Sequence, residues 1–391
     1  MTVEIATMTA EDCKTGEHKI CNRCVMDTSD SAITFDAAGV CDHCRTYDTD
    51  IKPYWRTGDE GRADLDATVE KIRADGKRRD FDCIIGLSGG IDSSYLTYLA
   101  SKKLGLRPLV FHVDAGWNSQ IAVNNIERMV DKLGLDLHTE VINWRTMRDL
   151  QLAFFKSGVP HIDTPQDHSF FATMYKFAQQ YDVKYILTGA NFSTECIRNP
   201  LEWMYYQSDT TQIRDIHRRF GTLPLDDFPL TSILWYKVYL PYVKRIKVVR
   251  PLNSFDYNKA AASKLLQEEF GWQPYPQKHF ESRFTRFYEG FWLPKRFGYD
   301  TRRVQYSSLI LTGQMTRDEA LAQLQRPAYA ELDIDEEMRF VAKKLEISVA
   351  ELQSYLDAPR RTFRDYKSQQ TIYTAGARVM SALGMERGGK R

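Results

Sequence analysis

Short strand-like runs and helically spaced segments alternate through the middle of the chain. Phe81–Leu87 (FDCIIGL) is a compact apolar run, and similar runs recur after segments whose apolar residues repeat every three or four positions. This alternation is typical of a mostly parallel sheet covered by helices. The predicted strands are Phe81–Leu87, Arg107–Val113, Leu137–Asn143 and Lys184–Thr188, and the predicted helices between them are Ser93–Leu104, Ile121–Leu133 and His168–Tyr181.

Helical spacing also appears on both sides of this central region. Asp64–Ala74 predicts one amphipathic helix that leads into it. Beyond Ser307 the pattern is helical throughout, with predicted helices at Arg317–Leu324, Asp335–Leu345 and Val349–Leu356. We therefore expect an α/β protein with a doubly wound, mostly parallel sheet and a C-terminal helical region.

Composition narrows the functional classes. The chain has 391 residues, of which 43% are hydrophobic, and its formal net charge is +1. It contains no apolar run of about 18 residues, so no membrane span is expected. The start of the chain lacks the pattern of a signal peptide, which leads us to expect a cytoplasmic protein. The balanced charge gives no overall electrostatic footprint for nucleic acid, although a local basic patch is compatible with it.

Four cysteines near the N-terminus have the spacing of a metal site. Cys21 and Cys24 form one C-x2-C pair, and Cys41 and Cys44 form a second. Ala32–Phe35 is strand-like and precedes a turn, so a hairpin is expected to bring the pairs together. Four thiolates favour tetrahedral Zn2+, with an iron–sulfur cluster as the competitor. Such a closed site stabilises a fold or offers a docking surface, because it leaves no position for substrate.

These patterns divide the chain into four expected regions. A zinc-binding knuckle comes first, and a linker helix joins it to a nucleotide domain. A helical region for substrate or partner binding follows. The expected boundaries are 1–50, 51–80, 81–250 and 251–391.

A glycine-rich loop follows the first strand and precedes a helix. Its sequence, SGGIDSS, lets backbone N–H groups approach a polyphosphate, while serine hydroxyls and the helix start add donors. Asp92 would repel bare phosphate, which suggests a magnesium contact or a cap of the loop. The loop lacks the Walker A pattern, so γ-phosphate transfer is not implied. The candidate ATP-binding residues here are Ser88, Gly89, Gly90, Asp92, Ser93 and Ser94.

The string S-G-G-x-D-S after a buried strand resembles the loop of the PP-loop ATP pyrophosphatases, such as asparagine synthetase and NAD synthetase. The resemblance implies an adenine nucleotide alpha hydrolase-like fold in which the loop holds pyrophosphate and attack falls on the α-phosphorus. It also suggests that Val113 meets the adenine. Gly189 and Asn191, in a TG-x-N turn, resemble the second nucleotide turn.

Two further acids are candidates for catalysis beside Asp92. Asp114 follows the second strand, at the edge where ligands of such sheets lie, and the resemblance places it near the ribose or a metal. Glu195 lies just beyond the second turn and is a candidate for holding magnesium or positioning ammonia. The alternatives are that Asp114 caps a turn and that Glu195 only favours the first turn of a helix.

The segment Lys278–Arg303 is dense in basic and aromatic residues. Guanidinium groups grip phosphate or carboxylate, and aromatic faces pack on sugar or base, so this segment fits an anionic substrate with rings. The same residues can instead solvate a helix face, and a similar composition can bind RNA. The substrate-binding candidates are Lys278, Arg283, Arg286, Lys295, Arg296 and Arg302.

Taken together, several motifs resemble the N-acetyl sugar amidotransferase family, which serves bacterial surface polysaccharide and flagellin glycan pathways. They are CNRCVMDTSD (Cys21–Asp30), CDHC (Cys41–Cys44), GLSGGIDSSY, TGANFSTEC, Lys278–Arg303 and Ser307–Leu321. The resemblance implies conversion of an acetamido group on a nucleotide-activated acidic sugar to acetamidino, with ATP, Mg2+ and Zn2+ as cofactors. It also implies a glutaminase subunit and a cyclase-like subunit that supply ammonia, because the chain shows no glutaminase signature of its own.

Two other functions remain open at this point. A tRNA-modifying thiolase also pairs cysteine knuckles with this loop, but it needs a reactive cysteine near the nucleotide, and only Cys196 is available. A zinc-knuckle binding protein with an inactive nucleotide domain is disfavoured, because Ser88, Gly89, Gly90, Asp92 and Ser93 are all intact.

Overall fold

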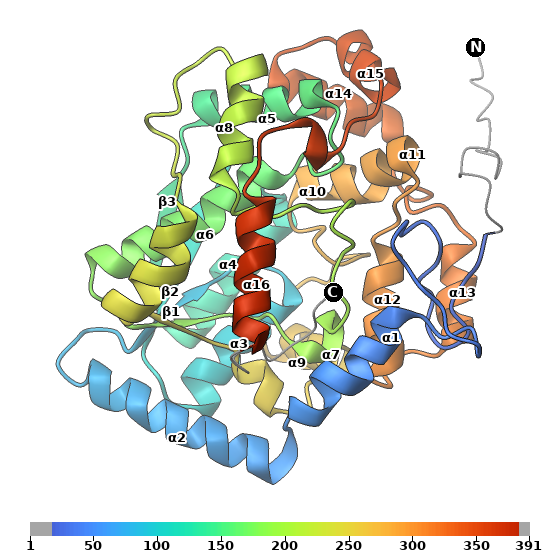
Figure 1. Ribbon diagram of the computed structural model, residues 1–391. Helices are drawn as coiled ribbons and strands as arrows, with labels where there is room; N and C mark the ends of the chain where they lie inside the picture. The colour runs from blue at the N-terminus through green and yellow to red at the C-terminus, as the bar shows by residue number, and fades with distance from the viewer. Residues whose placement is uncertain (1–17, 383–391) are drawn as a thin grey trace.

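The computed structural model describes residues 18–382 and has a parallel sheet at its centre (Figure 1). The strand order is β3-β2-β1-β4-β5, and every neighbouring pair is parallel. Residues 1–17 and 383–391, the outer ends of the first and last expected regions, lie outside the described residues. The strands are β1 (Cys83–Gly86), β2 (Pro108–Asp114), β3 (Leu137–Val141), β4 (Tyr185–Leu187) and β5 (Lys247–Val249).

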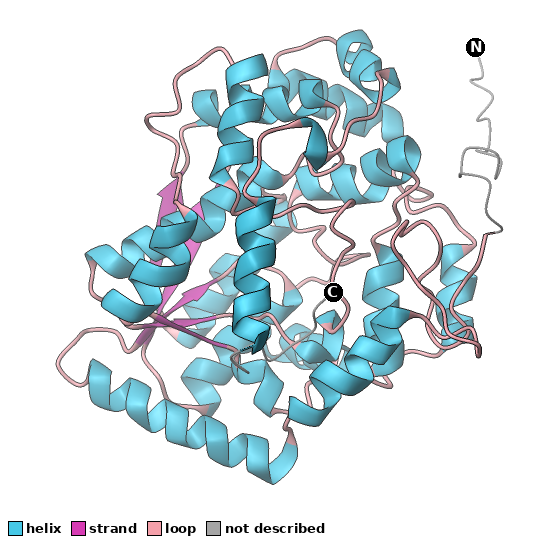
Figure 2. Ribbon diagram, viewed as in Figure 1, coloured by secondary structure: helices cyan, strands magenta, loops and turns pink. Residues whose placement is uncertain are grey.

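Helices pack on both faces of this sheet (Figure 2). The long helices around it are α2 (Gly58–Gly76), α4 (Gln120–Leu133), α5 (Trp144–Ser157), α6 (Thr164–Gln180) and α9 (Lys259–Phe270), together with α3 (Ile91–Tyr98) and α8 (Thr210–Phe220). The C-terminal part contains α10 (Arg283–Phe287), α11 (Leu293–Phe297), α12 (Arg302–Leu311), α13 (Arg317–Leu324), α14 (Ile334–Leu345), α15 (Val349–Asp357) and α16 (Gln370–Ala382). The short helices are α1 (Asp42–Thr46) and α7 (Phe192–Glu195).

Strand β1 is apolar on both faces, as expected for a strand in the middle of the sheet. Ile84 belongs to a core cluster with residues of α5 and α6, whereas Cys83 and Ile85 pack with residues of α2 and α3 on the other face. Both faces of a parallel sheet are normally buried, so its strands are continuous apolar runs rather than alternating ones. The expected doubly wound α/β fold is therefore confirmed.

Most differences from the sequence prediction occur where elements are short or exposed. The predicted helix Ser93–Leu104 begins earlier, at Ile91, and after Tyr98 continues as a wider π-helical turn over Leu99–Lys103. β5 was not predicted, because this edge strand has only three residues and is largely exposed. The predicted hairpin of the cysteine knuckle is reduced to an isolated bridge between Phe35 and Cys41. No helix of the described part of the chain is long and apolar enough to span a bilayer.

The four knuckle cysteines converge as their spacing predicts. Their sulfur atoms all lie within 4.8 Å of one another, and all four side chains are fully buried. The Sγ–Sγ distances are 3.8 Å for Cys21–Cys44, 3.6 Å for Cys24–Cys41 and 3.7 Å for Cys41–Cys44. A tetrahedron with Zn–S bonds of about 2.3 Å has edges of about 3.8 Å, so the cluster fits zinc.

The knuckle packs against two helices of the C-terminal region (Figure 1). Arg317 of α13 donates from Nε to the carbonyl oxygens of Cys21 and Cys24, both at 3.1 Å. Ser307 of α12 accepts from the backbone N–H of Val25 at 3.1 Å. Residues of α12 and α13 also line the large cavity described below. The four-cysteine knuckle therefore supports the wall of that cavity formed by α12 and α13.

We predict that Cys44→Ser lowers both the metal content and the stability of the protein. Loss of one thiolate opens the tetrahedral site, and loss of a structural metal typically costs on the order of 4 kcal/mol or more of unfolding free energy. Metal analysis and chemical denaturation measure the two effects. Cys83→Ala is the control, since it removes a buried thiol of β1 and leaves the knuckle intact. Full metal retention in Cys44→Ser would contradict the assignment.

Candidate functional site

The site lies where the strand order reverses. From β1 the chain moves outward to β2 and β3 on one side, while β4 and β5 lie on the other side. At such a switch point the loops after adjacent strands diverge and leave a crevice at the carboxyl ends of the strands. The loop after β1 and the turn after β4 carry the two sequence motifs. The fold thus brings together two motifs about a hundred residues apart in the sequence.

Glycine is required at the tip of the first loop. Gly89 has φ +82°, a left-handed conformation, and a Cβ atom there would lie 2.7 Å from the carbonyl oxygen of Ala122. The carbonyl oxygen of Gly89 accepts hydrogen bonds from Trp272 Nε1 at 3.0 Å and from Tyr275 Oη at 3.2 Å. The loop is therefore fixed from α4 on one side and from the segment after α9 on the other.

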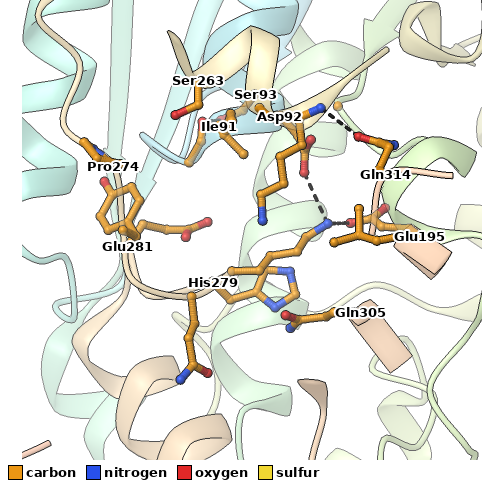
Figure 3. A pocket seen from close by; sticks show the side chains of 18 of the residues that line it. Ile91, Asp92, Ser93, Glu195, Ser263, Pro274, His279, Glu281, Gln305 and Gln314 are labelled. Carbon is orange, nitrogen blue, oxygen red and sulfur yellow. Dashed lines mark hydrogen bonds and ion pairs between the residues drawn. The ribbon is translucent and has the colours of Figure 1, made fainter. Parts of the chain in front are cut away.

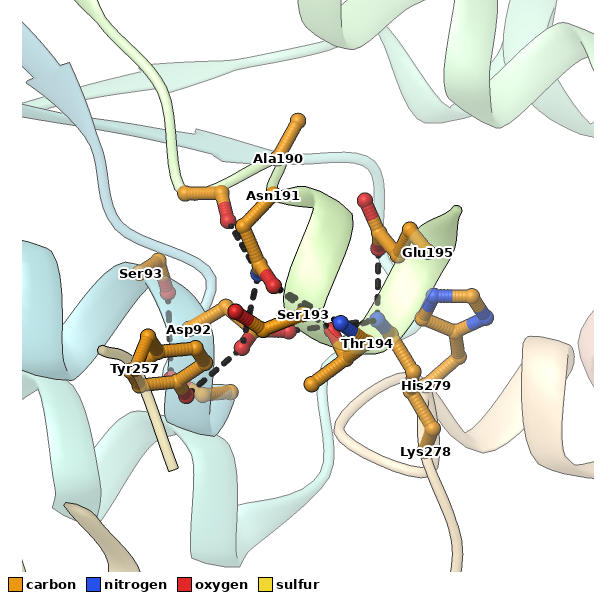
Figure 4. Close-up of polar contacts among 12 residues, drawn as sticks. Asp92, Ser93, Ala190, Asn191, Ser193, Thr194, Glu195, Tyr257, Lys278 and His279 are labelled. Atoms are coloured by element: carbon orange, nitrogen blue, oxygen red, sulfur yellow. Dashed lines mark hydrogen bonds and ion pairs between the residues drawn. The ribbon is translucent and has the colours of Figure 1, made fainter. Parts of the chain in front are cut away.

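The turn after β4 lies directly against the start of α3. A Cβ atom on Gly189 would come 2.9 Å from the backbone carbonyl carbon of Asp92. Asn191 Nδ2 donates to Asp92 Oδ1 at 3.3 Å and to the Gly189 carbonyl at 2.9 Å. Tyr257 Oη donates to the same Asp92 oxygen at 2.7 Å (Figure 4). Asp92 thus joins the two predicted nucleotide motifs.

Two of the three predicted serine hydroxyls face the cavity. Ser88 and Ser93 line it, and their hydroxyl oxygens lie 3.2 Å apart. Ser93 also donates to the carbonyl oxygen of Gly90 at 3.1 Å. Ser94 is fully buried, and among the described residues its hydroxyl has no hydrogen-bond partner. Ser94 does not line the cavity, so its predicted contact with ATP has no support in this geometry.

The cavity over these loops has a volume of about 760 Å3 (Figure 3). Lys278 crosses it and forms ion pairs with Asp92 Oδ2 at 3.2 Å and with Glu195 Oε1 at 2.5 Å. Burial opposes a charge on Lys278, but the two carboxylates outweigh it and raise its pKa. Burial likewise works against ionised Asp92, yet Lys278 and Tyr257 lower the Asp92 pKa below its usual value. Lys278 and Asp92 are therefore both charged at neutral pH.

A second helix begins at the same cavity. Asn258 caps α9 by accepting from the backbone N–H of Ala261 at 2.9 Å, and Lys259 is the first residue of that helix. Both residues line the cavity, as do Ile91 and Asp92 in the first turn of α3. Burial and the charge of nearby Lys278 lower the pKa of Lys259. Two positive helix ends and two lysines suit an anion with several charges.

Sequence reasoning missed several residues of this cavity. Glu281 accepts from Ser88 Oγ at 3.3 Å and enters the cavity opposite Glu195 (Figure 3). Glu281 lies in the Lys278–Arg303 segment, which drew attention for its basic and aromatic residues, and no local motif marks the others, because only tertiary packing brings them to the loop. The density of aromatic residues after α9 is the one signal the sequence offers for them. The missed residues of the lining are Lys259, Trp272, Tyr275 and Glu281, and Tyr257 was missed as the hydrogen-bond partner of Asp92.

Two residues predicted near the adenine or ribose lie elsewhere. Asp114 accepts from the backbone N–H of Gly116 at 2.7 Å and from Asn118 Nδ2 at 3.2 Å. This is the turn-capping role named as the alternative. Val113 is buried in β2, and neither Val113 nor Asp114 lines the cavity. Their predicted contacts with ATP therefore find no support in the geometry.

Of the six basic substrate-binding candidates, Lys278 alone lines the cavity. Arg283 and Arg286 pair with Glu337 of α14. Arg296 donates to the carbonyl oxygen of Pro359 at 3.2 Å, and Arg302 pairs with Asp300 at 2.6 Å. Through these contacts the guanidinium groups join helices of the C-terminal region to one another and do not face the cavity. Lys295, on α11, is half-buried and also lies outside the cavity lining.

Cys196, the candidate thiol of a thiolase, is poorly placed for reaction. Its side chain is 4% exposed, and it lies 3.8 Å from the carbonyl oxygen of Ser308. Burial raises the pKa of this thiol to about 12, so little thiolate forms at neutral pH. It does not line the cavity. The geometry therefore disfavours sulfur chemistry at the nucleotide loop.

Comparison with known families gives two matches in different parts of the chain. Residues 65–190 match the asparagine synthase family, and residues 281–380 match the C-terminal domain of WbpG-like LPS biosynthesis proteins. The first match covers β1 to β4 with the glycine loop and ends at Ala190, inside the turn after β4, whereas the second covers α10 to α16 except its last residues. No curated protein matches the chain.

Solved structures resemble the fold only distantly. An NH3-dependent NAD synthetase from Campylobacter jejuni is 15% identical, with a TM-score of 0.31, over 73% of this chain and 96% of that one. An NMN synthetase from Francisella tularensis is 18% identical, with a TM-score of 0.27, over 57% and 91%. A predicted tRNA methyltransferase subunit from Methanocaldococcus jannaschii is 16% identical, with a TM-score of 0.27, over 48% and 76%. Similarity this low carries no argument about function.

We predict that Gly189→Ala weakens ATP binding at least about tenfold, or about 1.4 kcal/mol, because the added methyl group forces the two nucleotide turns apart. Equilibrium titration with ATP measures the effect. Gly376→Ala is the matched control, since a Cβ atom there meets nothing within 4 Å. That control should leave ATP affinity unchanged and stabilise α16 slightly. Equal ATP affinity in Gly189→Ala and wild type would show that the turns do not form the nucleotide site.

The matches and the geometry agree on the architecture. The asparagine synthase match contains the glycine loop and the turn after β4 as far as Ala190, and the WbpG-like match contains the helices that the arginines join. The expected relationship to PP-loop ATP pyrophosphatases is thereby confirmed. The chain thus matches the asparagine synthase family over residues 65–190 and the C-terminal domain of the WbpG-like LPS biosynthesis proteins over residues 281–380.

Proposed function

We propose that the protein is an ATP-dependent amidotransferase that converts an acetamido group of an acidic, nucleotide-linked sugar to acetamidino. One observation carries the proposal: Lys278 bridges Asp92 of the first nucleotide motif and Glu195, just after the second, inside a cavity of about 760 Å3. A cation between two carboxylates at the helix starts suits chemistry in which negative charge develops on a phosphate.

In this proposal ATP binds in this cavity. The backbone around Gly90, the starts of α3 and α9, and the ammonium groups of Lys259 and Lys278 all present positive charge to it. In this proposal the glycine loop holds the pyrophosphate portion of ATP, and Lys278 faces the phosphorus under attack. The absence of a Walker A lysine agrees with loss of pyrophosphate rather than of a single phosphate.

Magnesium has suitable ligands here. Mg2+ prefers carboxylate oxygens and substrate phosphates, and Asp92, Glu195 and Glu281 line the cavity. Asp92 is part of the glycine-loop motif itself, and Glu281 accepts a hydrogen bond from Ser88 of that loop. These two carboxylates would hold the ion with ATP. When bound, magnesium would offset charge on the phosphates and make pyrophosphate a better leaving group.

The reaction balances with ammonia as the second substrate. The amide oxygen attacks the α-phosphorus, the bond to pyrophosphate breaks, and an O-adenylyl imidate forms. Ammonia then adds to the imidate carbon, a proton is lost, and AMP leaves with the former amide oxygen. The match to LPS biosynthesis proteins supports a surface sugar as the acceptor. We further propose that a glutaminase subunit and a cyclase-like subunit deliver the ammonia.

A coupled assay tests this function directly. The protein is incubated with ATP, Mg2+, an ammonium salt and nucleotide-linked diacetamido sugars, and the products are analysed by mass spectrometry. The proposal expects AMP, pyrophosphate and a sugar in which one oxygen is replaced by NH. Release of ADP, or AMP formation that depends on tRNA and not on sugar, would contradict it.

We predict that Lys278→Met lowers the rate of AMP formation by about 100-fold to 1,000-fold, the usual effect of removing a charge that stabilises a transition state. Lys264→Met is the control, because Lys264 lies on α9 with its side chain 76% exposed, away from the cavity. Circular dichroism and melting curves establish that both variants are folded. Wild-type rates in folded Lys278→Met would remove this lysine from the chemistry.

A further inference from the structure

A second cavity adjoins the nucleotide cavity. It has a volume of about 570 Å3, within the range of about 300–1,000 Å3 that small-molecule sites occupy. The two cavities share four lining residues. These are Glu195, Lys278, His279 and Gln305. A molecule in the second cavity would therefore meet the nucleotide cavity at the lysine that bridges Asp92 and Glu195.

The shared edge is held in a defined shape. His279 has φ +65°, an uncommon backbone conformation for a residue other than glycine. Its Nδ1 lies 3.0 Å from Glu289 Oε1, and Thr301 donates to the other oxygen of Glu289 at 3.2 Å. Desolvation opposes a charge on His279, but Glu289 outweighs it and raises the His279 pKa to about 9. The imidazole is therefore a fixed, positively charged group between the cavities (Figure 4).

Aromatic rings form much of the remaining wall. Tyr206 and Tyr373 stack with ring centroids 4.2 Å apart, which brings the C-terminal helix α16 against the cavity. Tyr373 is also hydrogen-bonded to Ser208 at 2.7 Å. On another part of the wall, Tyr236 packs on Phe171 at 5.5 Å. Flat, partly polar rings of this kind pack on sugars and bases.

The polar groups of the cavity favour an anion. Arg198 and Lys237 line it, and Lys237 Nζ lies 4.8 Å from the centre of the Tyr236 ring. The acids of the lining are Glu195 and Glu289, which pair with Lys278 and His279 at the shared edge. Away from that edge Lys237 supplies a positive charge, and the amides of Asn199 and Gln207 can bind neutral groups.

We propose that this second cavity binds the acceptor: an acetamido sugar with an anionic group, whose acetamido end meets Lys278 and whose anionic end meets Lys237. The proposal rests on the proposed amidotransferase function and adds to it the place of the sugar. In this proposal Lys237 recognises the anion. The arginines suggested by the sequence, Arg283, Arg286, Arg296 and Arg302, instead join helices. The anion is either a nucleotide phosphate or a sugar carboxylate.

Binding measurements test the site without relying on turnover. UDP-N-acetylglucosamine supplies a phosphate without a carboxylate, and N-acetylneuraminate supplies a carboxylate without a phosphate. We expect one of them to bind the wild-type protein. We expect Tyr206→Ala and Lys237→Ala each to weaken that binding about tenfold, with unchanged ATP affinity. The probe that binds identifies the anion.

Matched controls exist for both variants. Tyr242 is a tyrosine with 63% exposure outside the cavity, and Lys247 is an exposed lysine on β5. Tyr242→Ala and Lys247→Ala should bind the probe as the wild type does. Failure of both probes to bind the wild type, or unchanged binding in Tyr206→Ala and Lys237→Ala, overturns the acceptor site.

The two proposals fail separately. If the variants lose probe binding but the wild type makes ADP instead of AMP, the cavity assignment stands and the adenylation chemistry falls. If acetamido sugars yield AMP at wild-type rates and wild-type KM in both variants, the chemistry stands and the cavity assignment falls.

Discussion

The contact between two nucleotide turns, with Lys278 across it, is the interaction on which the rest of the site depends. The turn after β4 approaches α3 so closely that only glycine fits at position 189. Asp92 then accepts hydrogen bonds from Asn191 and Tyr257 and pairs with Lys278. Because these partners come from β4, from the segment before α9 and from the segment before α10, one carboxylate positions three separate parts of the chain.

The buried ion pairs of Lys278 affect the stability of the protein as well as the chemistry of the site. Breaking a buried ion pair by removing one partner typically destabilises a protein by about 3–5 kcal/mol, because the other charge is left without compensation. Here Lys278 is only 9% exposed and pairs with two carboxylates. Such a lysine is positioned before substrate arrives and does not reorganise when phosphate charge develops, which is how enzymes obtain large electrostatic effects.

The sequence predicted what is local and missed what is assembled from a distance. β1 to β4 were predictable, since they are apolar runs or lie between amphipathic helices, and both nucleotide turns were recognisable from short motifs. Tyr257, Lys259 and Glu281 carry no such motif, because their proximity to Gly90 and Asp92 arises only from packing of the C-terminal segments. The arginines of Lys278–Arg303 show the opposite case. Their density suggested substrate binding, but acids far along the chain, notably Glu337, engage two of them.

The central claim is that an amide oxygen attacks the α-phosphorus of ATP at the joined turns. The most direct measurement uses an acetamido acceptor whose carbonyl oxygen is isotopically labelled. Mass spectrometry of the nucleotide products then follows the label. The account predicts that the label appears in AMP and that pyrophosphate is unlabelled. Label retained in the sugar product, or found in pyrophosphate or inorganic phosphate, would contradict it.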